Sequence, residues 1–478
     1  MSYPSIDDGD ASWGFSDACK ASRISRPTET FDVTFGAASP FTLRQELEDQ
    51  RYGNYYRDVR VSGDVIFRRT GADTPGPSIV VEVVVNDESI PVGVEFDSSS
   101  QQLVITTPRS IAWDNTLAGP CVNLRATVWV PEDGQLGFLS VHTVHLNIKL
   151  LDNLSIQVAS QTYLNSTVGH IVAASNGEDD EGLKHRGSPS SFVLNSRYIE
   201  LKTISAPIRG AWPLYDYLGL QSTSGSIHVG IEPQPDAEGQ EPKPAILYVR
   251  TTSGSVEALE KIDLAQSAFA ASQISDQAAV AADQAVLQAK DYLPPRDYRV
   301  DVYSTSGTVH AALAFSSSCS IHTTSATVNA DLLPLLDSSL AEGGSRQVSL
   351  ETHTTSGSMT LNIADPLWID TKAGLYAALG PDAAAQAAHA WRSLTSRHSS
   401  TSSSLRVFYP ASWEGDIDLG TLSGSMSLKG KDVKLIRAGK DWPGVKKAVK
   451  ARKGPEGGST MTVRTTSGSI TVQVGPEK

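Results

Sequence analysis

The chain has 478 residues and carries 40 Lys and Arg against 53 Asp and Glu, a formal net charge of −13. Hydrophobic residues make up 40% and charged residues 19%, which is enough to build a sizeable core and excludes disorder throughout. The acidic balance argues against wholesale nucleic-acid binding, because that function needs a basic footprint.

The N-terminal segment, residues 1–23, is polar, and we expect it to be disordered. Its first ten residues have neither a basic n-region nor an apolar core, so we expect no secretory signal. The most apolar stretch, Ser78–Val85, is interrupted by Glu82 and is far too short to cross a bilayer. The sequence therefore predicts a chain without a membrane span.

Residues 24–150 show β-strand patterns without a clean repeat. Alternating or continuous apolar runs bounded by turn residues indicate strands. Examples are Ile79–Val85, Leu103–Thr107, Val122–Val130 and Leu139–Leu150. We interpret this part as early, degenerate repeats or as a capping β-domain.

Residues 151–478 contain a recurring string of the type Thr-Ser-Gly-Ser-Val. Apolar side chains fall at odd offsets before its central small residue and at even offsets after it. A straight strand cannot change faces, so we predict a corner at each copy, with glycine there because a corner often needs a positive φ. The predicted corners are Gly225, Gly254, Gly307, Ala326, Gly357, Gly424 and Gly468.

A strand–corner–strand unit cannot bury its inner face alone, but stacked copies can. We therefore predict an all-β fold, a β-solenoid or β-helix-like array, whose shortest rung is the 19 residues from Gly307 to Ala326. Inward positions on both sides of the corners should be almost fully buried. They are Leu220, Val249, Val302, Ile321, Leu419, Val463, Ile227, Val256, Val309, Val328 and Ile470.

Longer gaps between copies predict insertions at about 259–295, 371–404 and 429–458. Leu259–Lys290 and Pro381–Arg392 have helical character. His398–Ser404 is expected to be a flexible loop. Lys429–Lys453 holds ten Lys and Arg against two Asp, and we expect a solvated loop that could contact acidic polymers or a membrane surface.

The last repeat, Met461–Val474, runs almost to the C-terminus. Its open edge needs a cover, which could be an inserted helix, the earlier β-region or a second copy of the chain. We expect cover from within the chain, and therefore a monomer.

Three cysteines, Cys19, Cys121 and Cys319, allow at most one disulfide. Because one disulfide cannot form a framework, we do not expect a disulfide-stabilised scaffold. The spacing of the cysteines matches neither a zinc site nor a redox pair. Cys319 falls in an inward column, which predicts a buried, inert thiol.

The repeat and its apolar flanks, from Ile199 to Val474, resemble the putative-adhesin family of β-solenoid domains of unknown function. The segment Ile24–Phe31 resembles the start of this region in fungal-type members. The resemblance implies an adhesin-like protein at a cell surface or close to a membrane. It supplies no catalytic residues.

Outward positions offer few candidates for chemistry. His228, Glu257 and His310 each lie three residues after a corner, so stacking at about 4.8 Å per strand could align them as metal ligands. An ordinary solvated strand face is the simpler interpretation. A second outward column, for which chance polar placement is enough, holds His322, His353, Arg250 and Arg464.

The best acidic pair for a β-helix carbohydrate-active enzyme is Asp416 and Asp418, which lie on one strand face. An ordinary solvated face explains them as well. The sequence shows no nucleophile elbow, phosphate-binding loop or dinucleotide fingerprint. We therefore predict no catalytic, cofactor-binding or metal-binding residues and no cofactor. The site residues that we do predict are the repeat corners, and their role is structural.

The function that the sequence favours is a non-enzymatic, adhesin-like structural or interaction scaffold. Its partner would be an unknown protein or a polysaccharide, and not nucleic acid. Two alternatives stay open: a β-helix carbohydrate-active enzyme and a soluble intracellular partner-binding protein.

Overall fold

The computed structural model describes residues 19, 23–48, 56–71, 76–113, 119–151, 154–173, 193–237, 239, 241–274, 289–337, 347–370, 375–376, 394–440 and 447–476. These residues form β-strands almost throughout, so the predicted all-β class is confirmed. The chain divides into two compact units: residues 1–196 with 202–206, and residues 197–201 with 207–478. The domain boundary predicted near residue 150 stays a prediction.

Unit 1 consists of strands of mixed direction. One sheet contains β1 (Ile24–Ser25), β2 (Glu29–Asp32), β5 (Arg60–Arg69), β6 (Ser78–Val85), β10 (Cys121–Val130), β12 (Asn147–Leu150) and β15 (Ile171–Ala173). A second contains β3 (Gly36–Glu48), β7 (Gly93–Asp97), β8 (Gln102–Pro108), β11 (Gly134–Thr143), β13 (Ser155–Val158), β14 (Thr162–Ser166) and β16 (Val193–Ser196). β10 pairs antiparallel with β6 but parallel with β5, and β3 pairs parallel with both β8 and β11. β4 (Tyr56–Asp58) and β9 (Ser110–Ala112) form a small separate pair.

A disulfide joins Cys19 to Cys121, the first residue of β10, with the two Cα atoms 5.7 Å apart. Both cysteines are completely buried. Of the segment predicted to be disordered, residues 1–23, only Cys19 and Arg23 lie within the described residues.

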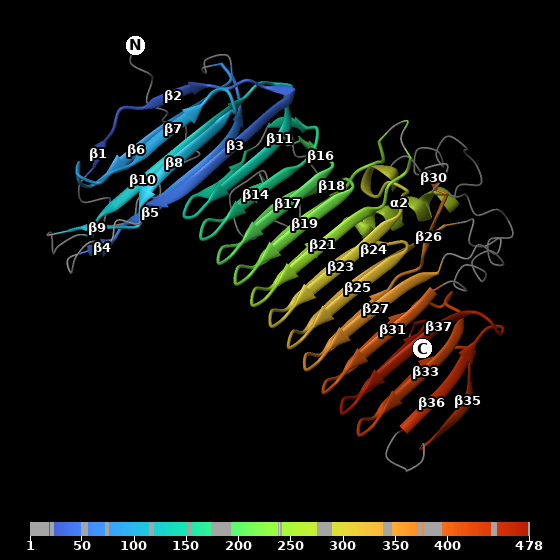
Figure 1. Ribbon diagram of the computed structural model, residues 1–478. Coiled ribbons are helices and arrows are strands. Elements are labelled where there is room, and N and C mark those ends of the chain that lie inside the picture. Colours follow the sequence, from blue (N-terminus) through green and yellow to red (C-terminus); the bar gives the residue numbers. More distant parts are fainter. Residues whose placement is uncertain are drawn as a thin grey trace. The chain divides into compact units, whose positions relative to one another are not determined.

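Unit 2 repeats a rung of two strands, one in each of two sheets (Figure 1). Sheet B contains, in stacking order, β19 (Tyr217–Ser222), β21 (Ala245–Thr251), β23 (Tyr298–Ser304), β25 (Ser318–Thr323), β27 (Val348–Thr354), β31 (Leu394–Ser400), β37 (Ser459–Thr465) and β33 (Gly415–Thr421), all parallel. Sheet A contains β18 (Ile208–Leu214), β20 (Ile227–Pro233), β22 (Val256–Leu259), β24 (Val309–Phe315), β26 (Val328–Asp337), β28 (Met359–Ile363), β32 (Leu405–Tyr409), β38 (Ile470–Val474) and β34 (Met426–Gly430), also parallel. β17 (Tyr198–Thr203) belongs in part to each unit, and β29 (Leu367–Asp370) and β30 (Leu375–Tyr376) extend the edge of β26.

The core of unit 2 is made of the inward columns of the two sheets. All eleven positions predicted to be inward are at most 1% exposed, so the register of the repeat is confirmed. The change of parity at each corner has a simple cause: the chain leaves sheet B and enters sheet A there. Cys319 is a buried free thiol, and burial raises its pKa, as expected of an inert cysteine.

The stacking order departs from chain order near the C-terminus. β37 lies between β31 and β33 (Figure 1), and β38 lies between β32 and β34. The final rung is therefore covered from within the chain, but by none of the three candidates considered. The rung that precedes it in sequence, Gly415–Gly430, covers it, because the last rung lies between that rung and β31 with β32. The oligomeric state stays a prediction.

The insertions differ in part from expectation. Helix α2 (Ile262–Ile274) falls in the predicted helical segment Leu259–Lys290, and Pro381–Arg392 lies outside the described residues. The loop predicted at His398–Ser404 is wrong, because β31 and a corner at Ser403 occupy it. The loop predicted within Lys429–Lys453 is also wrong: β35 (Val433–Lys440) and β36 (Lys447–Lys453) form an antiparallel hairpin that pairs with β33.

Candidate functional site: a ring-lined groove on sheet B

The corners are held by a buried hydroxyl three residues before the small residue. The Oγ1 atom of Thr251 accepts a hydrogen bond from the Gly254 backbone N–H at 3.0 Å, and Thr354 does the same for Gly357 at 3.1 Å. Such local side-chain hydrogen bonds fix a turn without a left-handed residue. The first Thr of Thr-Thr-Ser-Gly is thus a structural residue that the sequence analysis missed, although its position repeats.

Glycine is required at most corners for a reason other than the predicted positive φ. That prediction is wrong, since none of the described corner glycines has a positive φ. A Cβ on Gly254 would instead lie 2.0 Å from the Gly225 carbonyl oxygen, and one on Gly307 would lie 1.8 Å from that of Gly254. The rungs therefore meet backbone to backbone at the corners.

The structure aligns the predicted column His228, Glu257 and His310 on the outer face of sheet A. The Glu257 carboxylate lies between the imidazoles, with its oxygens 3.3 Å from His228 Nδ1 and 3.5 Å from His310 Nδ1. Among the described residues, no group of three potential ligands has the arrangement needed to hold a metal ion. The column is a chain of polar contacts between imidazole and carboxylate groups on a partly exposed face.

Asp416 and Asp418 each face an arginine. Asp416 accepts a hydrogen bond from Arg452 at 2.5 Å, and Asp418 pairs with Arg464. These carboxylates tie β33 to its two neighbours, β36 and β37. Their contacts are those of structural residues, and neither lines a described groove.

The outer face of sheet B carries a column of rings. Tyr303, His322 and His353 occupy matching positions on β23, β25 and β27. The rings of Tyr303 and His322 stack with centroids 5.6 Å apart and planes 15° apart, and His353 follows at 6.1 Å. Tyr248 on β21 adds a fourth ring, 6.0 Å from Tyr303.

These rings line an open groove of about 600 Å³ beside the corners. The side chains of Arg250, Thr305, Thr324 and Thr355 line it as well, whereas Thr251, Ser304 and Thr323, at its floor, are buried. A smaller depression of about 300 Å³ continues along the same column past Ser399 to Arg464. We call the larger one the ring groove.

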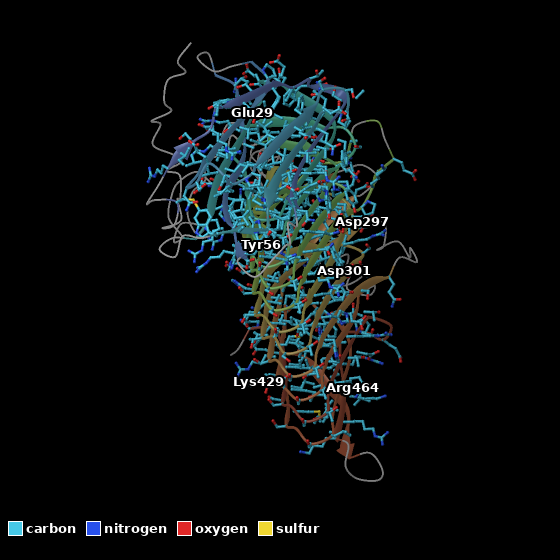
Figure 2. The ribbon with its side chains drawn as sticks, turned by 60° about the vertical axis from the view of Figure 1, so that its left-hand side comes forward. Glu29, Tyr56, Asp297, Asp301, Lys429 and Arg464 are labelled. Carbon is cyan, nitrogen blue, oxygen red and sulfur yellow. A yellow bond between two sulfur atoms is a disulfide. The ribbon has the colours of Figure 1, made fainter. Side chains whose placement is uncertain are left out.

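Sequence reasoning placed His322, His353, Arg250 and Arg464 in one outward column, and the strand register does so. It missed Tyr303 and Tyr248. Tyr303 lies four residues before Gly307, as His322 lies four before Ala326 and His353 four before Gly357. Reading that offset through all repeats would have found Tyr303 but not Tyr248, which lies six residues before Gly254. Figure 2 shows Asp301 and Arg464, both on sheet B, on the same side of unit 2, with Lys429 on the other.

Within the described residues, no helix is long and apolar enough to cross a membrane. No protein-family model matches the chain, and no curated protein matches it. Among solved structures, a chain from Clostridium sporogenes described as "a putative cell adhesion protein" is similar over 94% of this chain and 99% of its own length, with 7% identity and a TM-score of 0.15. At that score the likeness carries no argument about fold or function.

Proposed function

We propose that unit 2 is a flattened β-solenoid and that the protein is a non-enzymatic, adhesin-like scaffold that binds an extended polysaccharide along the ring groove. The observation that carries this proposal is the column of Tyr303, His322 and His353, with Tyr248 beside it in the neighbouring column, along an open groove that also contains Arg250. The resemblance of the repeat to the adhesin-like family agrees with it.

The chemistry of the groove suits sugars. A pyranose ring presents an apolar C–H face that packs on an aromatic ring, while its hydroxyls need donors and acceptors at the edge. Tyr303 is 38% exposed, so its ring is accessible, and Arg250 and Thr305 supply polar groups beside it. Because strands repeat every 4.8 Å or so, an extended polymer laid along the column meets a ring on three successive strands, at Tyr303, His322 and His353.

The buried disulfide between Cys19 and Cys121 supports a location outside a reducing compartment. Disulfides persist mainly in oxidising environments such as the cell surface. This favours the adhesin-like role over the alternative of an intracellular partner-binding protein. Localising the tagged full-length protein would distinguish the two.

The alternative of a carbohydrate-active enzyme was based on Asp416 and Asp418, which pair with arginines away from the groove. The carboxylates nearest the rings are Asp301 and Glu351, which face outward in the neighbouring column. They are two strand spacings apart, about 10 Å, which is at or beyond the separation of roughly 6.5–9.5 Å used by inverting glycosidases. Release of reducing ends from a bound polysaccharide, abolished by Asp301→Asn, would favour the enzyme.

The test is a binding titration with soluble polysaccharides, namely a β-glucan, a mannan and a galactan. We expect the wild type to bind at least one of them, and Tyr303→Ala to weaken that binding roughly tenfold, equivalent to about 1.4 kcal/mol. Tyr198→Ala is the matched control, because Tyr198 is also 38% exposed but does not line the groove. Equal binding by Tyr303→Ala and the wild type, or no binding to any of the three, would contradict the proposal.

A further inference from the structure

The far end of unit 2 is strongly basic. The hairpin of β35 and β36 extends sheet B beyond β33, and β34 ends sheet A. The segment Lys429–Lys453, which includes this hairpin, holds ten Lys and Arg against two Asp, in a chain whose net charge is −13. We call β34, β35 and β36 together the basic end.

Two large apolar side chains are exposed in the middle of this charge. Leu435 is 63% exposed and Ile436 is 58% exposed, the highest values among the large hydrophobic side chains described. Leu435 is the last residue of a column that belongs to the core. In order across the sheet this column contains Met461, Ile417 and Ala451, each 1% exposed, and then Leu435. The apolar core thus runs out to the surface at the basic end.

The edge of β35 is built against strand addition. A bulge between Leu435 and Arg437 leaves Ile436 without a partner position on β36. Bulges and basic residues such as Lys434 are devices that stop another strand from pairing at an edge. A symmetric dimer through this edge would also bring two strongly positive segments together. A second copy of the chain and an added peptide strand are therefore poor occupants.

We propose that the basic end docks on an anionic lipid bilayer, with Leu435 and Ile436 entering the headgroup region and the surrounding Lys and Arg contacting the anionic headgroups. Adjacent exposed apolar residues inside a basic surround are typical of segments that lie in a membrane interface. Charge complementarity selects anionic lipid, because positive side chains gain from the negative surface potential. The described surface around the apolar pair includes Lys431, Lys434 and Arg437, all exposed.

The experiment is vesicle co-sedimentation of the full chain at low and at physiological salt. Vesicles of phosphatidylcholine alone are compared with vesicles in which part is replaced by phosphatidylserine. We expect binding to the anionic vesicles only, weakened as salt rises. Leu435→Ser/Ile436→Ser and, separately, Lys434→Glu/Arg437→Glu should each lower the bound fraction at least fivefold. Val168→Ser/Ile204→Ser is the matched control, because both residues are 51% exposed in unit 1, and it should bind as the wild type does.

The outcomes separate lipid from other anions. If Leu435→Ser/Ile436→Ser keeps wild-type binding while the charge variant loses it, the attraction is by charge alone, as for any polyanion, and the proposed insertion of the apolar pair is wrong. Failure of the wild type to bind anionic vesicles at low salt also overturns it. Thermal melting of each variant checks folding, and unchanged polysaccharide binding by the variants shows that the ring groove is intact.

Discussion

A methyl group at Gly357 tests the backbone-to-backbone packing of the corners. In stacking order, Gly357 lies between Ala326 and Ser403, two corners that already carry a Cβ. A Cβ on Gly357 would lie 1.6 Å from the Ala326 carbonyl oxygen, about half of an ordinary contact distance. Each of these two corners now has a glycine corner on both sides of it in the stack. Gly357→Ala would therefore put three corners that carry a Cβ next to one another.

The cost follows from what must move. Separating the rungs there weakens the hydrogen bonds from Ser356 N to Thr324 O at 2.9 Å, from Val328 N to Ser358 O at 2.9 Å and from Thr355 N to Thr323 O at 3.3 Å. Three such bonds at roughly 1 kcal/mol each, or an overpacking cost of about 1–3 kcal/mol, predict a loss of about 3 kcal/mol. For a unit of this size that lowers the melting temperature by roughly 6–12 °C.

Calorimetry of Gly357→Ala beside two controls measures the effect. Gly439→Ala should be close to neutral, because nothing lies within 4 Å of its added Cβ and its φ is not positive. Gly424→Ala should cost less than Gly357→Ala, since β34 is an edge strand that can shift. A melting temperature for Gly357→Ala equal to that of the wild type would refute the packing argument.

Three further predictions concern the disulfide, a buried histidine and the order of the rungs. Cys121→Ser, or reduction of the wild type, should remove about 2–4 kcal/mol of stability, seen as a lower midpoint of urea unfolding; an unchanged midpoint would show that Cys19 and Cys121 are not linked. Burial lowers the pKa of His398 to about 3, below its unfolded value near 6.5. The free energy of unfolding that depends on neutral His398 is therefore fully present above pH 6.5, and it falls by about 1.4 kcal/mol per pH unit as the pH is lowered from 6.5 toward 3. His398→Gln should remove that part of the pH dependence of unfolding, and an identical slope in the variant would contradict the assignment. Because β37 lies between β31 and β33, the double variant Arg397→Cys/Thr462→Cys should form a disulfide, whereas Arg397→Cys/Asp418→Cys should not. The opposite pattern would show that β33 pairs directly with β31, as in chain order.

The repeat carried enough information to predict the core. Period-two alternation and the change of parity at each corner identify inward positions such as Val249 and Val309, because burial in stacked strands depends on local pattern alone. The reason for glycine could not be predicted, since the clash involves the backbone of another rung. The backbone φ of the corner, which is a purely local property, is not the cause.

The strands missed by the sequence analysis are those whose signal is weak or depends on distant partners. β31 has polar inward residues, Ser396 and His398, which are buried because Thr352 and Tyr409 provide hydrogen-bond partners. A period-two apolar pattern is absent there, so the segment resembled a loop. The basic hairpin was missed because its strands gain their stability from the edge of β33.

The candidate site was only half predictable. Offsets from the corners put His322 and His353 in one column, but the depth of the groove beside them depends on the size of neighbouring side chains and on the turn geometry. The ion pairs of Asp416 and Asp418 with Arg452 and Arg464 likewise depend on which strands become neighbours.

The central claim, that a polysaccharide lies along the ring groove, is tested most directly by footprinting the histidines. Diethyl pyrocarbonate labelling, read by peptide mass spectrometry, would be measured with and without a polysaccharide that the chain binds. We predict that ligand protects His322 and His353, which line the groove, and leaves His228 and His310, on the outer face of sheet A, labelled as before. Protection of His228 and His310 instead, or equal labelling of all four with ligand bound, would contradict the account.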